Sequence, residues 1–354
     1  MKLYEFTIKP VSGFGTALKG DTLFGHFCWQ VVHDHSLING ENSLTEEHKS
    51  LAGSVKLANL LQSYEKKPFA IFSSAFPRLA FPLRYALKKP DLPQHLLFAD
   101  DKTDCKEHQR KIKEKKKKKW MLVEGGANLS LLKAGNFKDD DLLNPKELLE
   151  KISGTKTENS SFLRTFVQPH NSINRLTNTT GTDPFAPYVQ ESVHYYPETE
   201  LVIFVLIDES ATDADRIRLG LERIGKWGYG RDASIGMGRF TVVNKAELTL
   251  PDASEANAIY TLAPSVPLKG AFSKAWFTPF TRFGKHGDKL ASRKNPFKNP
   301  VIMADEGAVF EPADRTCFEK PYWGQAIRNV SKSQENTVVQ GYAPYLPLKM
   351  ERMS

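Results

Sequence analysis

The pattern of hydrophobic and polar positions is clearest at the start of the chain. KLYEFTIKP, residues 2–10, predicts a strand, because apolar residues alternate with polar ones along it. A link with three glycines follows, and DTLFGHFCWQVVHDH then predicts a helix with Asp21 or Thr22 as its N-cap. The apolar stripe of this helix would consist of Leu23, Phe24, Phe27, Cys28, Val31 and Val32.

Similar patterns return further along the chain. LTEEHKSLAGSVKLANLLQSYEKK predicts a second helix, and FAIFSSAFPRLAFPLRY should be extended because Pro77 and Pro82 exclude a regular helix. HYYPETELVIFVLIDE predicts a strand, and DADRIRLGLERIGKW predicts a helix that buries Ile217, Leu221 and Ile224. A glycine-rich segment and the strand GRFTVVNKAEL complete this part.

These elements predict an α+β protein with tandem ferredoxin-like (RRM-like) domains. Residues 1–247 would form the first domain, a βαββαβ unit with a long insertion at about 90–198. The pattern loosens within that insertion, where only a short helix near NPKELLEKI is expected. Residues 248–354 would form a second, mainly β ferredoxin-like domain, since this part is rich in proline, glycine and aromatic residues.

Composition narrows the class of protein. The hydrophobic fraction of 40% and the charged fraction of 25% are typical of globular proteins. The longest strongly apolar run, LVIFVLI, is too short to span a bilayer, and the start lacks the apolar core of a signal peptide. We therefore expect a cytoplasmic protein with no membrane partner. The three cysteines are too widely spaced to predict a disulfide framework or a zinc site, and Cys28 should act as a small core hydrophobe.

The net charge of +8 is concentrated in one place. KEHQRKIKEKKKKK, Lys106 to Lys119, holds nine Lys/Arg and two Glu, a net charge of +7. This run is either a solvated insertion or a flexible arm that neutralises nucleic-acid phosphates. The basic pI by itself therefore does not indicate RNA binding.

The segment GKWGYGRDASIGMGRF is the strongest candidate for a binding site. It holds five glycines in its first fourteen residues, against 23 in the 354 residues of the chain. Such a loop can present free backbone N–H groups to an anion, with arginine and lysine donors around it and Trp227 or Tyr229 to stack on a base. The candidate residues are Lys226, Gly228, Gly230, Arg231, Ser234, Gly236, Gly238 and Arg239. The alternative is a plain helix-to-strand connection with Gly228 or Gly230 as C-cap.

Two further segments carry hydrogen-bonding groups. SGFGTALKGDTLFG places small residues and Lys19 before a helix N-terminus, a position that favours anions. In a ferredoxin-like unit this link should lie near the glycine-rich segment. HNSINRLTNTTG, residues 170–181, is rich in donors for phosphate, sugar and base edges, although a polar surface hairpin explains it almost equally well.

Catalytic constellations are weak. His26, His33 and His35 lie on or near the first predicted helix, and no second cluster supports a metal centre. The sequence contains neither G-x-S-x-G nor H-E-x-x-H. We therefore expect no catalytic residues, no metal and no cofactor.

Three segments together resemble a known family. GTALKGDTLFGHFCW, HNSINRLTNTTG and GYGRDASIGMGRF, in this order, are similar to segments of the RAMP superfamily of CRISPR proteins. More narrowly, they resemble the crRNA 5′-handle-binding, Csm-type (Cas5-group) subunit of type III effector complexes, as does the ending VVQGYAPYLPLKM. The segment from Pro90 to Lys156 matches nothing in that family.

The resemblance implies a subunit without nuclease activity that holds the handle of crRNA and has an inserted β-hairpin between handle and guide. Its partners would be crRNA, the polymerase-like large subunit and the backbone RAMP subunits, with target RNA reached through the complex. Carried over by motif, the handle contacts are Lys19, Gly20, Thr22, His170, Asn171, Arg175, Arg231, Ser234 and Arg239.

Two alternatives stay open. One is a metal-independent endoribonuclease of the same superfamily, which processes repeat RNA with His26, His33 or His170 as general base. The other is a structural subunit whose glycine loop contacts only protein.

Overall fold

The computed structural model covers the chain from Met1 to Ser354. It describes residues 1–38, 46–80, 82–98, 118–127, 129, 132–134, 142–143, 145–146, 161–181, 185–196 and 199–350. Cys105, the lysine run up to residue 117 and most of the segment NPKELLEKI lie outside the described residues. No helix in the described ranges is long and apolar enough to cross a membrane.

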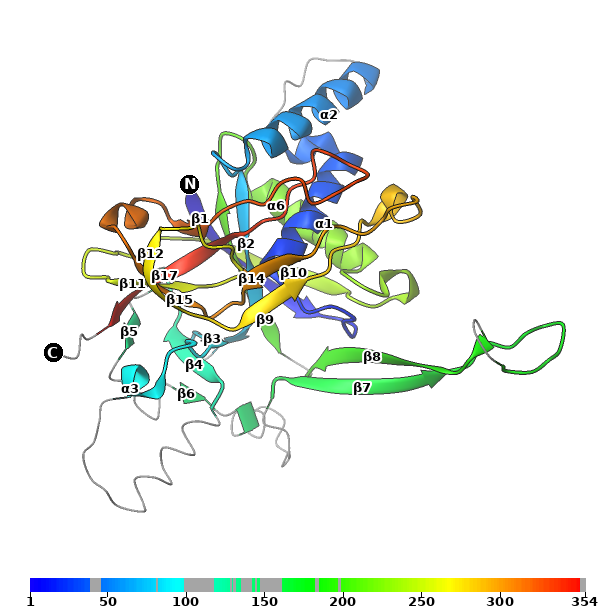
Figure 1. Cartoon of the computed structure of the whole chain (residues 1–354), viewed down its shortest axis with the longest axis horizontal. Coiled ribbons are helices and arrows are strands. Elements are labelled where there is room, and N and C mark those ends of the chain that lie inside the picture. The colour runs from blue at the N-terminus through cyan, green and yellow to red at the C-terminus, as the bar shows by residue number, and fades with distance from the viewer. Residues whose placement is uncertain are drawn as a thin grey trace.

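The described chain is a mixed α+β structure with more strands than helices, which confirms the predicted class (Figure 1). The helices are α1 (Gly20–His33), α2 (Glu46–Ser63), α3 (Gln94–Leu97) and α6 (Ala214–Trp227), with 3-10 helices η1 (His35–Leu37), η4 (Ala233–Ile235), η5 (Asp288–Leu290) and η6 (Arg315–Glu319).

The strands extend along the whole chain. They are β1 (Lys2–Pro10), β2 (Ala70–Leu79), β3 (Arg84–Lys88), β4 (Trp120–Glu124), β5 (Leu132–Ala134), β6 (Leu142–Leu143), β7 (Leu163–His170), β8 (Tyr188–Tyr195), β9 (Glu200–Ile207), β10 (Phe240–Leu248), β11 (Ala258–Thr261), β12 (Phe272–Trp276), β13 (Pro279–Arg282), β14 (Val301–Ala304), β15 (Val309–Pro312), β16 (Tyr322–Gly324) and β17 (Tyr342–Met350).

The first sheet has the strand order β10-β1-β9-β2-β3-β4-β6, and every neighbouring pair is antiparallel. Along the chain the first four strands of this order are connected as β1–α1–η1–α2–β2 and β9–α6–η4–β10. The chain between β2 and β9 contains the long insertion and adds β3, β4 and β6 to the same sheet. The helices α1 and α6 contact each other and also β2 and β10, respectively. The two loops that leave β1 and α6 therefore lie at the same edge of the sheet.

The second sheet is built from the C-terminal part of the chain. Its order is β12-β15-β11-β17-β16, and β5 from the long insertion adds to β17 in parallel. Over residues 249–350, all of which are described, the only helices are η5 and η6, in keeping with the mainly β character expected there. The hairpin of β13 and β14 forms a separate two-stranded sheet.

One hydrophobic core joins the two sheets. It contains Phe72 and Val205 from the first sheet together with Tyr260 and Leu346 from the second. The buried Gln340 side chain bonds both the N–H and the C=O of Phe72, at 3.0 and 2.7 Å. Because the two sheets share this core, the core does not divide at residue 247. The domain boundary after residue 247 therefore stays a prediction.

The sequence predicts only in part which side chains of α1 are buried and where the helix begins. Leu23, Phe24, Phe27 and Val31 are buried as expected, and Cys28 is partly buried against the core, but Val32 is exposed. The N-cap prediction is wrong, because the helix already begins at Gly20 after Lys19. Asp21 instead accepts two bonds from the Arg282 guanidinium, at 2.6 and 2.9 Å.

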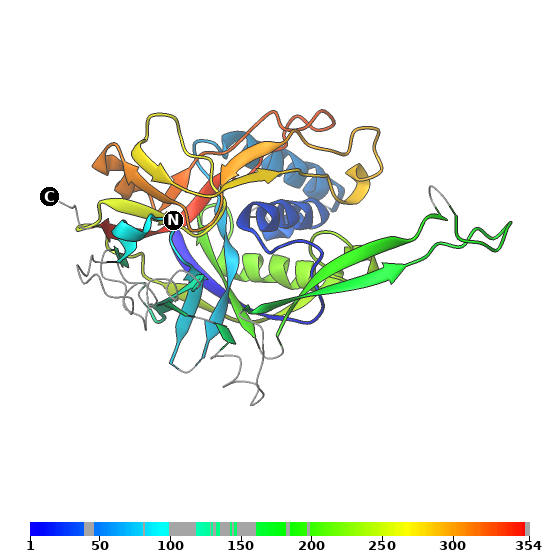
Figure 2. The ribbon, with the colours of Figure 1, turned by 60° about the horizontal axis from the view of Figure 1, so that its bottom comes forward.

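The inserted region contains an arm whose strands the hydrophobic pattern does not predict, although the family resemblance implies an inserted β-hairpin. β7 and β8 pair over their full length and project from the body of the molecule (Figures 1 and 2). HYYPETELVIFVLIDE accordingly holds the end of β8 and all of β9, not one strand. Side chains on both faces of β7 are exposed, which removes the alternation that identifies a half-buried strand.

Candidate nucleic-acid interface

The glycine-rich segment connects α6 to β10 through a tight, irregular loop. Gly228, Gly230, Gly236 and Gly238 all have positive φ, between 74° and 105°. Asp232 is also left-handed, with φ 66°, and precedes η4. Glycine is the residue that adopts such angles without steric cost, so the loop geometry itself requires it.

Close packing accounts for most of these glycines. A Cβ at Gly238 would lie 2.1 Å from the Tyr229 carbonyl oxygen, and one at Gly225 would lie 2.1 Å from that of Phe240. A Cβ at Gly228 or Gly230 would meet Met237 or Thr16, whereas Gly236 faces open space. The expectation that all five glycines leave room for a ligand backbone is therefore corrected: four of them leave room for this chain's own atoms.

The backbone amides of the loop are largely used within the protein. Nine N–H groups, those of residues 228–231 and 235–239, donate to acceptors in the chain. Among them, Gly230 donates to His26 Nε2 at 3.0 Å and Arg231 to Thr16 Oγ1 at 2.9 Å. The sequence predicts a run of backbone N–H groups that are free to bind an anion. In the structure this run is limited to the N–H groups of residues 232–234.

The same bonds join the loop to the link before α1, as the sequence predicts. Tyr229 is fully buried, and its hydroxyl donates to Ala17 O at 2.8 Å. The Gly238 N–H donates to Gly13 O at 2.7 Å. Tyr229 therefore anchors the loop and does not offer a face to a base, unlike Trp227, which is 72% exposed.

The base of the arm completes this region. Phe14 and Val193 exchange two backbone bonds, at 2.8 and 2.9 Å. Arg231 Nη2 donates to Glu191 O on β8 at 2.8 Å. The link, the glycine loop and the arm thus meet at one place, beside the N-terminal half of α1 (Figure 2).

Cationic side chains surround this junction on its outer side. Lys226, Arg231 and Arg239 are exposed, as are Ser234 and the indole of Trp227. The Arg231 guanidinium is held by Glu191 O and Asp232 but remains 58% exposed. A fixed arginine, further exposed cations and an exposed indole on one loop are groups that bind phosphates and stack on bases.

The predicted residues before and in α1 have other partners. Lys19 Nζ is paired with Asp305 at 2.5 Å and with Glu306 at 2.7 Å, so its charge is already neutralised inside the protein. Gly20 is buried, and a Cβ there would lie 2.1 Å from Phe72 O. Thr22 is partly buried. The expectation that Lys19 provides a point charge for an anion is corrected accordingly.

The third predicted segment lies elsewhere. His170 is the last residue of β7 and stacks on Tyr188, and Asn171 and Arg175 are exposed in the turn beyond it. The strand has eight residues, so at roughly 3.3 Å per residue His170 is about 25 Å from the base of the arm, and the turn with Asn171 and Arg175 lies further out. The structure therefore brings two of the three segments together and places the third at the far end of the arm (Figure 1).

His26 occupies the centre of the junction as a neutral acceptor. Its ring lies 4.9 Å from that of Tyr229, and burial lowers its pKa to about 4, helped by the charge of Lys298. Protonation would remove the lone pair that accepts the Gly230 N–H. The hydrogen bond that joins the glycine loop to α1 should therefore be lost in acid.

This makes a prediction for the pH dependence of stability. Between pH 6.5 and 4 the unfolded chain binds a proton at His26 that the folded chain does not, so stability falls as pH falls through this window. At pH 5 the loss should be about 2 kcal/mol relative to pH 7. Urea unfolding of the wild type and of His26→Gln at both pH values measures it. An equal loss in the two proteins would contradict the assignment.

The three histidines proposed for an RNase lie in three different places. His26 accepts the Gly230 N–H, His33 pairs with Asp288, and His170 stacks on Tyr188 at the outer end of β7. No group of three or more potential metal ligands occurs in the part of the chain that is described.

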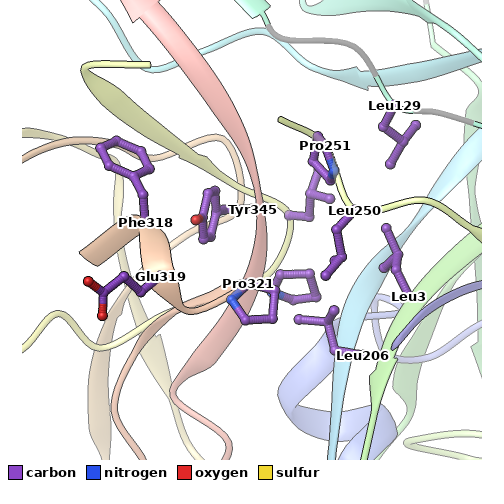
Figure 3. A pocket seen from close by; sticks show the side chains of 11 residues that line it. Leu3, Leu129, Leu206, Leu250, Pro251, Phe318, Glu319, Pro321 and Tyr345 are labelled. Atoms are coloured by element: carbon purple, nitrogen blue, oxygen red, sulfur yellow. The ribbon is translucent and has the colours of Figure 1, made fainter. Parts of the chain in front are cut away.

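A pocket on another side of the molecule has a different character. It lies between the two sheets near Leu3 and Tyr345, has a volume of about 100 Å³, and is lined mostly by leucine and proline side chains (Figure 3). Its charged lining residue is Glu319. An apolar pocket with an acidic rim does not suit a polyanion, so it is not the candidate interface.

Comparisons with known proteins support the fold. Neither a family model nor a curated protein sequence matches the chain. A chain from a crystal structure of the Csm1–Csm4 cassette with pppApA matches with a TM-score of 0.51 and 16% identity, over 100% of this chain and 99% of that one. The cassette with cA4 gives 0.52 and 16%, over 100% of both chains. A chain from the Csm3–Csm4 subcomplex of the type III-A CRISPR-Cas interference complex gives 0.52 and 14%, over 98% and 99%. Csm4 is the component that these assemblies share. The chain therefore has the fold of a Csm-type subunit of type III CRISPR complexes, which is the fold that the sequence resemblance predicts.

Proposed function

We propose that the protein is a non-catalytic subunit of a type III CRISPR interference complex that binds the 5′ handle of crRNA. One observation carries the proposal: the exposed Arg231, Arg239 and Trp227 surround the junction where the link before α1, the glycine loop and the arm meet. Guanidinium groups and an indole at one place suit single-stranded RNA, whose phosphates and bases are both accessible.

The architecture supports the same proposal. Four strands of the first sheet lie side by side in the order β10-β1-β9-β2. Numbered by their sequence in the chain, this order is fourth, first, third, second. The second sheet has the same order in β17-β11-β15-β12. This is the order of a ferredoxin-like unit, so we infer two such units, the second without its helices. Two units sharing one core fit a RAMP-type subunit with its long insertion.

The likeness to the Csm1–Csm4 and Csm3–Csm4 structures supports the proposed partners. We propose that this subunit docks the polymerase-like large subunit and a backbone RAMP subunit, and meets target RNA only through the assembled complex. The paired strands of the arm would be the hairpin that the family inserts between handle and guide.

The test is crRNA retention by the complex reconstituted from its subunits. Arg231→Ala with Arg239→Ala should weaken crRNA binding by roughly 1–3 kcal/mol for each lost arginine contact. The matched control is Lys274→Ala with Lys349→Ala, which removes two exposed positive charges from the second sheet. If the arginine variant retains crRNA as the control does, the glycine loop contacts only protein and the proposal fails.

The endoribonuclease alternative has a separate test. Repeat RNA is incubated with the purified chain in EDTA, and the products are resolved on a sequencing gel. We expect no specific cleavage, because His26 already accepts the Gly230 N–H, His33 pairs with Asp288 and His170 lies on the arm, so no two of these histidines are placed to act together as general base and general acid. Cleavage at one site that is abolished by His26→Ala, His33→Ala or His170→Ala would overturn the non-catalytic assignment.

A further inference from the structure

The loop between β13 and β14 carries features that the proposed function does not use. Residues 283–298, FGKHGDKLASRKNPFK, include five Lys/Arg and one Asp, a net charge of +4. The single acidic residue, Asp288, is paired with His33. All of the cations except Lys298 are exposed, so the loop presents a positive charge with little compensation.

Two aromatic rings are exposed within the same loop. Phe283 is 76% and Phe297 is 68% exposed, and Lys285 Nζ lies 5.6 Å from the centre of the Phe297 ring. Exposed apolar side chains that lie together and are rimmed by polar residues mark interaction sites. Aromatic rings interleaved with Lys and Arg are the combination that binds single-stranded nucleic acid without sequence preference.

The loop is held in place by its own backbone. Lys298 N–H donates to Gly284 O and His286 N–H to Pro296 O, both at 2.8 Å, and His286 Nε2 bonds Ser331 Oγ at 2.7 Å. These bonds hold the backbone next to Phe283 and Phe297, so a ligand would not need to order this part of the loop. Pre-arranged contacts of this kind lower the entropic cost of binding.

The loop lies next to the candidate interface across α1. Gly287 packs near Trp29, and Asp288 pairs with His33 at the end of the helix. Lys298 is close enough to His26 to lower its pKa, and His26 accepts the Gly230 N–H of the glycine loop. In Figure 2 the loop lies on one side of α1 and the arm emerges on the other, at the same end of the molecule.

We propose that loop 283–298 is a second contact for the same single-stranded RNA, in which Phe283 and Phe297 stack on bases while Lys289, Arg293 and Lys294 bind phosphates. This inference rests on the proposed function and extends its interface across α1. The three cations are exposed, and none of them forms an ion pair with a carboxylate of the described residues. A protein partner would also cover the rings, but the excess positive charge favours a polyanion.

The experiment measures crRNA affinity of the reconstituted complex at several salt concentrations. Phe283→Ala with Phe297→Ala should weaken binding about tenfold or more and leave the salt dependence unchanged. Lys289→Ala with Arg293→Ala and Lys294→Ala should lower the slope of log K against log salt by about 2, at roughly 0.7 per phosphate contact. Phe283→Tyr with Phe297→Tyr should bind as the wild type does, because a tyrosine ring stacks equally well.

The outcomes separate this inference from the proposed function. If both loop variants keep the wild-type affinity and salt slope while the Arg231/Arg239 variant loses affinity for crRNA, the inference is overturned and the proposed function stands. Loss in the loop variants with wild-type binding by the Arg231/Arg239 variant would keep the loop as an RNA site and refute the glycine-loop site. Loss of a protein subunit from the complex while crRNA affinity is unchanged would assign the loop to a protein partner and overturn the inference.

Discussion

Replacing Lys19 with methionine is expected to lower the free energy of unfolding by about 3–5 kcal/mol. The Lys19 side chain is only 13% exposed, and its ammonium lies between Asp305 and Glu306. Its removal leaves Glu306 without its counter-charge and Asp305 with only the more distant Lys88, at 3.9 Å. Burial raises the pKa of Glu306 above its usual value, against the opposing charge of Lys19. Urea unfolding at constant pH measures the loss.

The matched variants show whether the carboxylates cause this loss. Lys19→Arg should retain most of the stability, and Lys19→Met combined with Glu306→Gln should recover part of it. The loss should also grow as pH rises, because a carboxyl with a raised folded pKa stabilises the fold only while it is protonated. A loss below about 1 kcal/mol in Lys19→Met would show that the ion pair is not structural and would free Lys19 for an anion again.

Gly238→Ala is the second substitution with a large expected effect. Its φ of 74° costs an L-residue roughly 1–2 kcal/mol. The added Cβ would also lie 2.1 Å from the carbonyl oxygen and 2.5 Å from the amide nitrogen of Tyr229. Tyr229 is fully buried and cannot move without breaking its bond to Ala17. We therefore expect a loss of more than about 3 kcal/mol.

Gly236→Ala is the matched control for that experiment. Gly236 has a similar φ of 93°, but a Cβ there would meet nothing within 4 Å. The control should lose only the conformational cost of about 1–2 kcal/mol. Equal losses in the two variants, from thermal or urea unfolding, would mean that close packing does not explain Gly238.

The regular elements of the first sheet were predictable from periodicity. Ile217, Leu221 and Ile224 are all buried on one face of α6, as their spacing indicates, because a 3.6-residue repeat reports burial directly. The proximity of the glycine loop and the link before α1 also followed from the βαββαβ order. The arm did not follow, because β7 is exposed on both faces and carries no alternation.

The candidate site was predictable in position but not in detail. The number of glycines marked the loop correctly, yet the sequence does not say whether a glycine makes room for a ligand or for a neighbouring carbonyl, as at Gly238. Long-range pairs are equally invisible: Lys19 and Glu306 are 287 positions apart. The sequence alone did not single out loop 283–298, because its net charge of +4 is small beside the +7 of the Lys106–Lys119 run.

The central claim is that RNA lies against the exposed side of the glycine loop. Photo-crosslinking with 4-thiouridine at successive handle positions of crRNA, in the assembled complex, tests it most directly. Peptides that contain Trp227, Arg231 or Arg239 should carry the crosslinked nucleotide, and Lys19 should not. Crosslinks from every handle position to other subunits, with none to residues 226–240, would contradict the account.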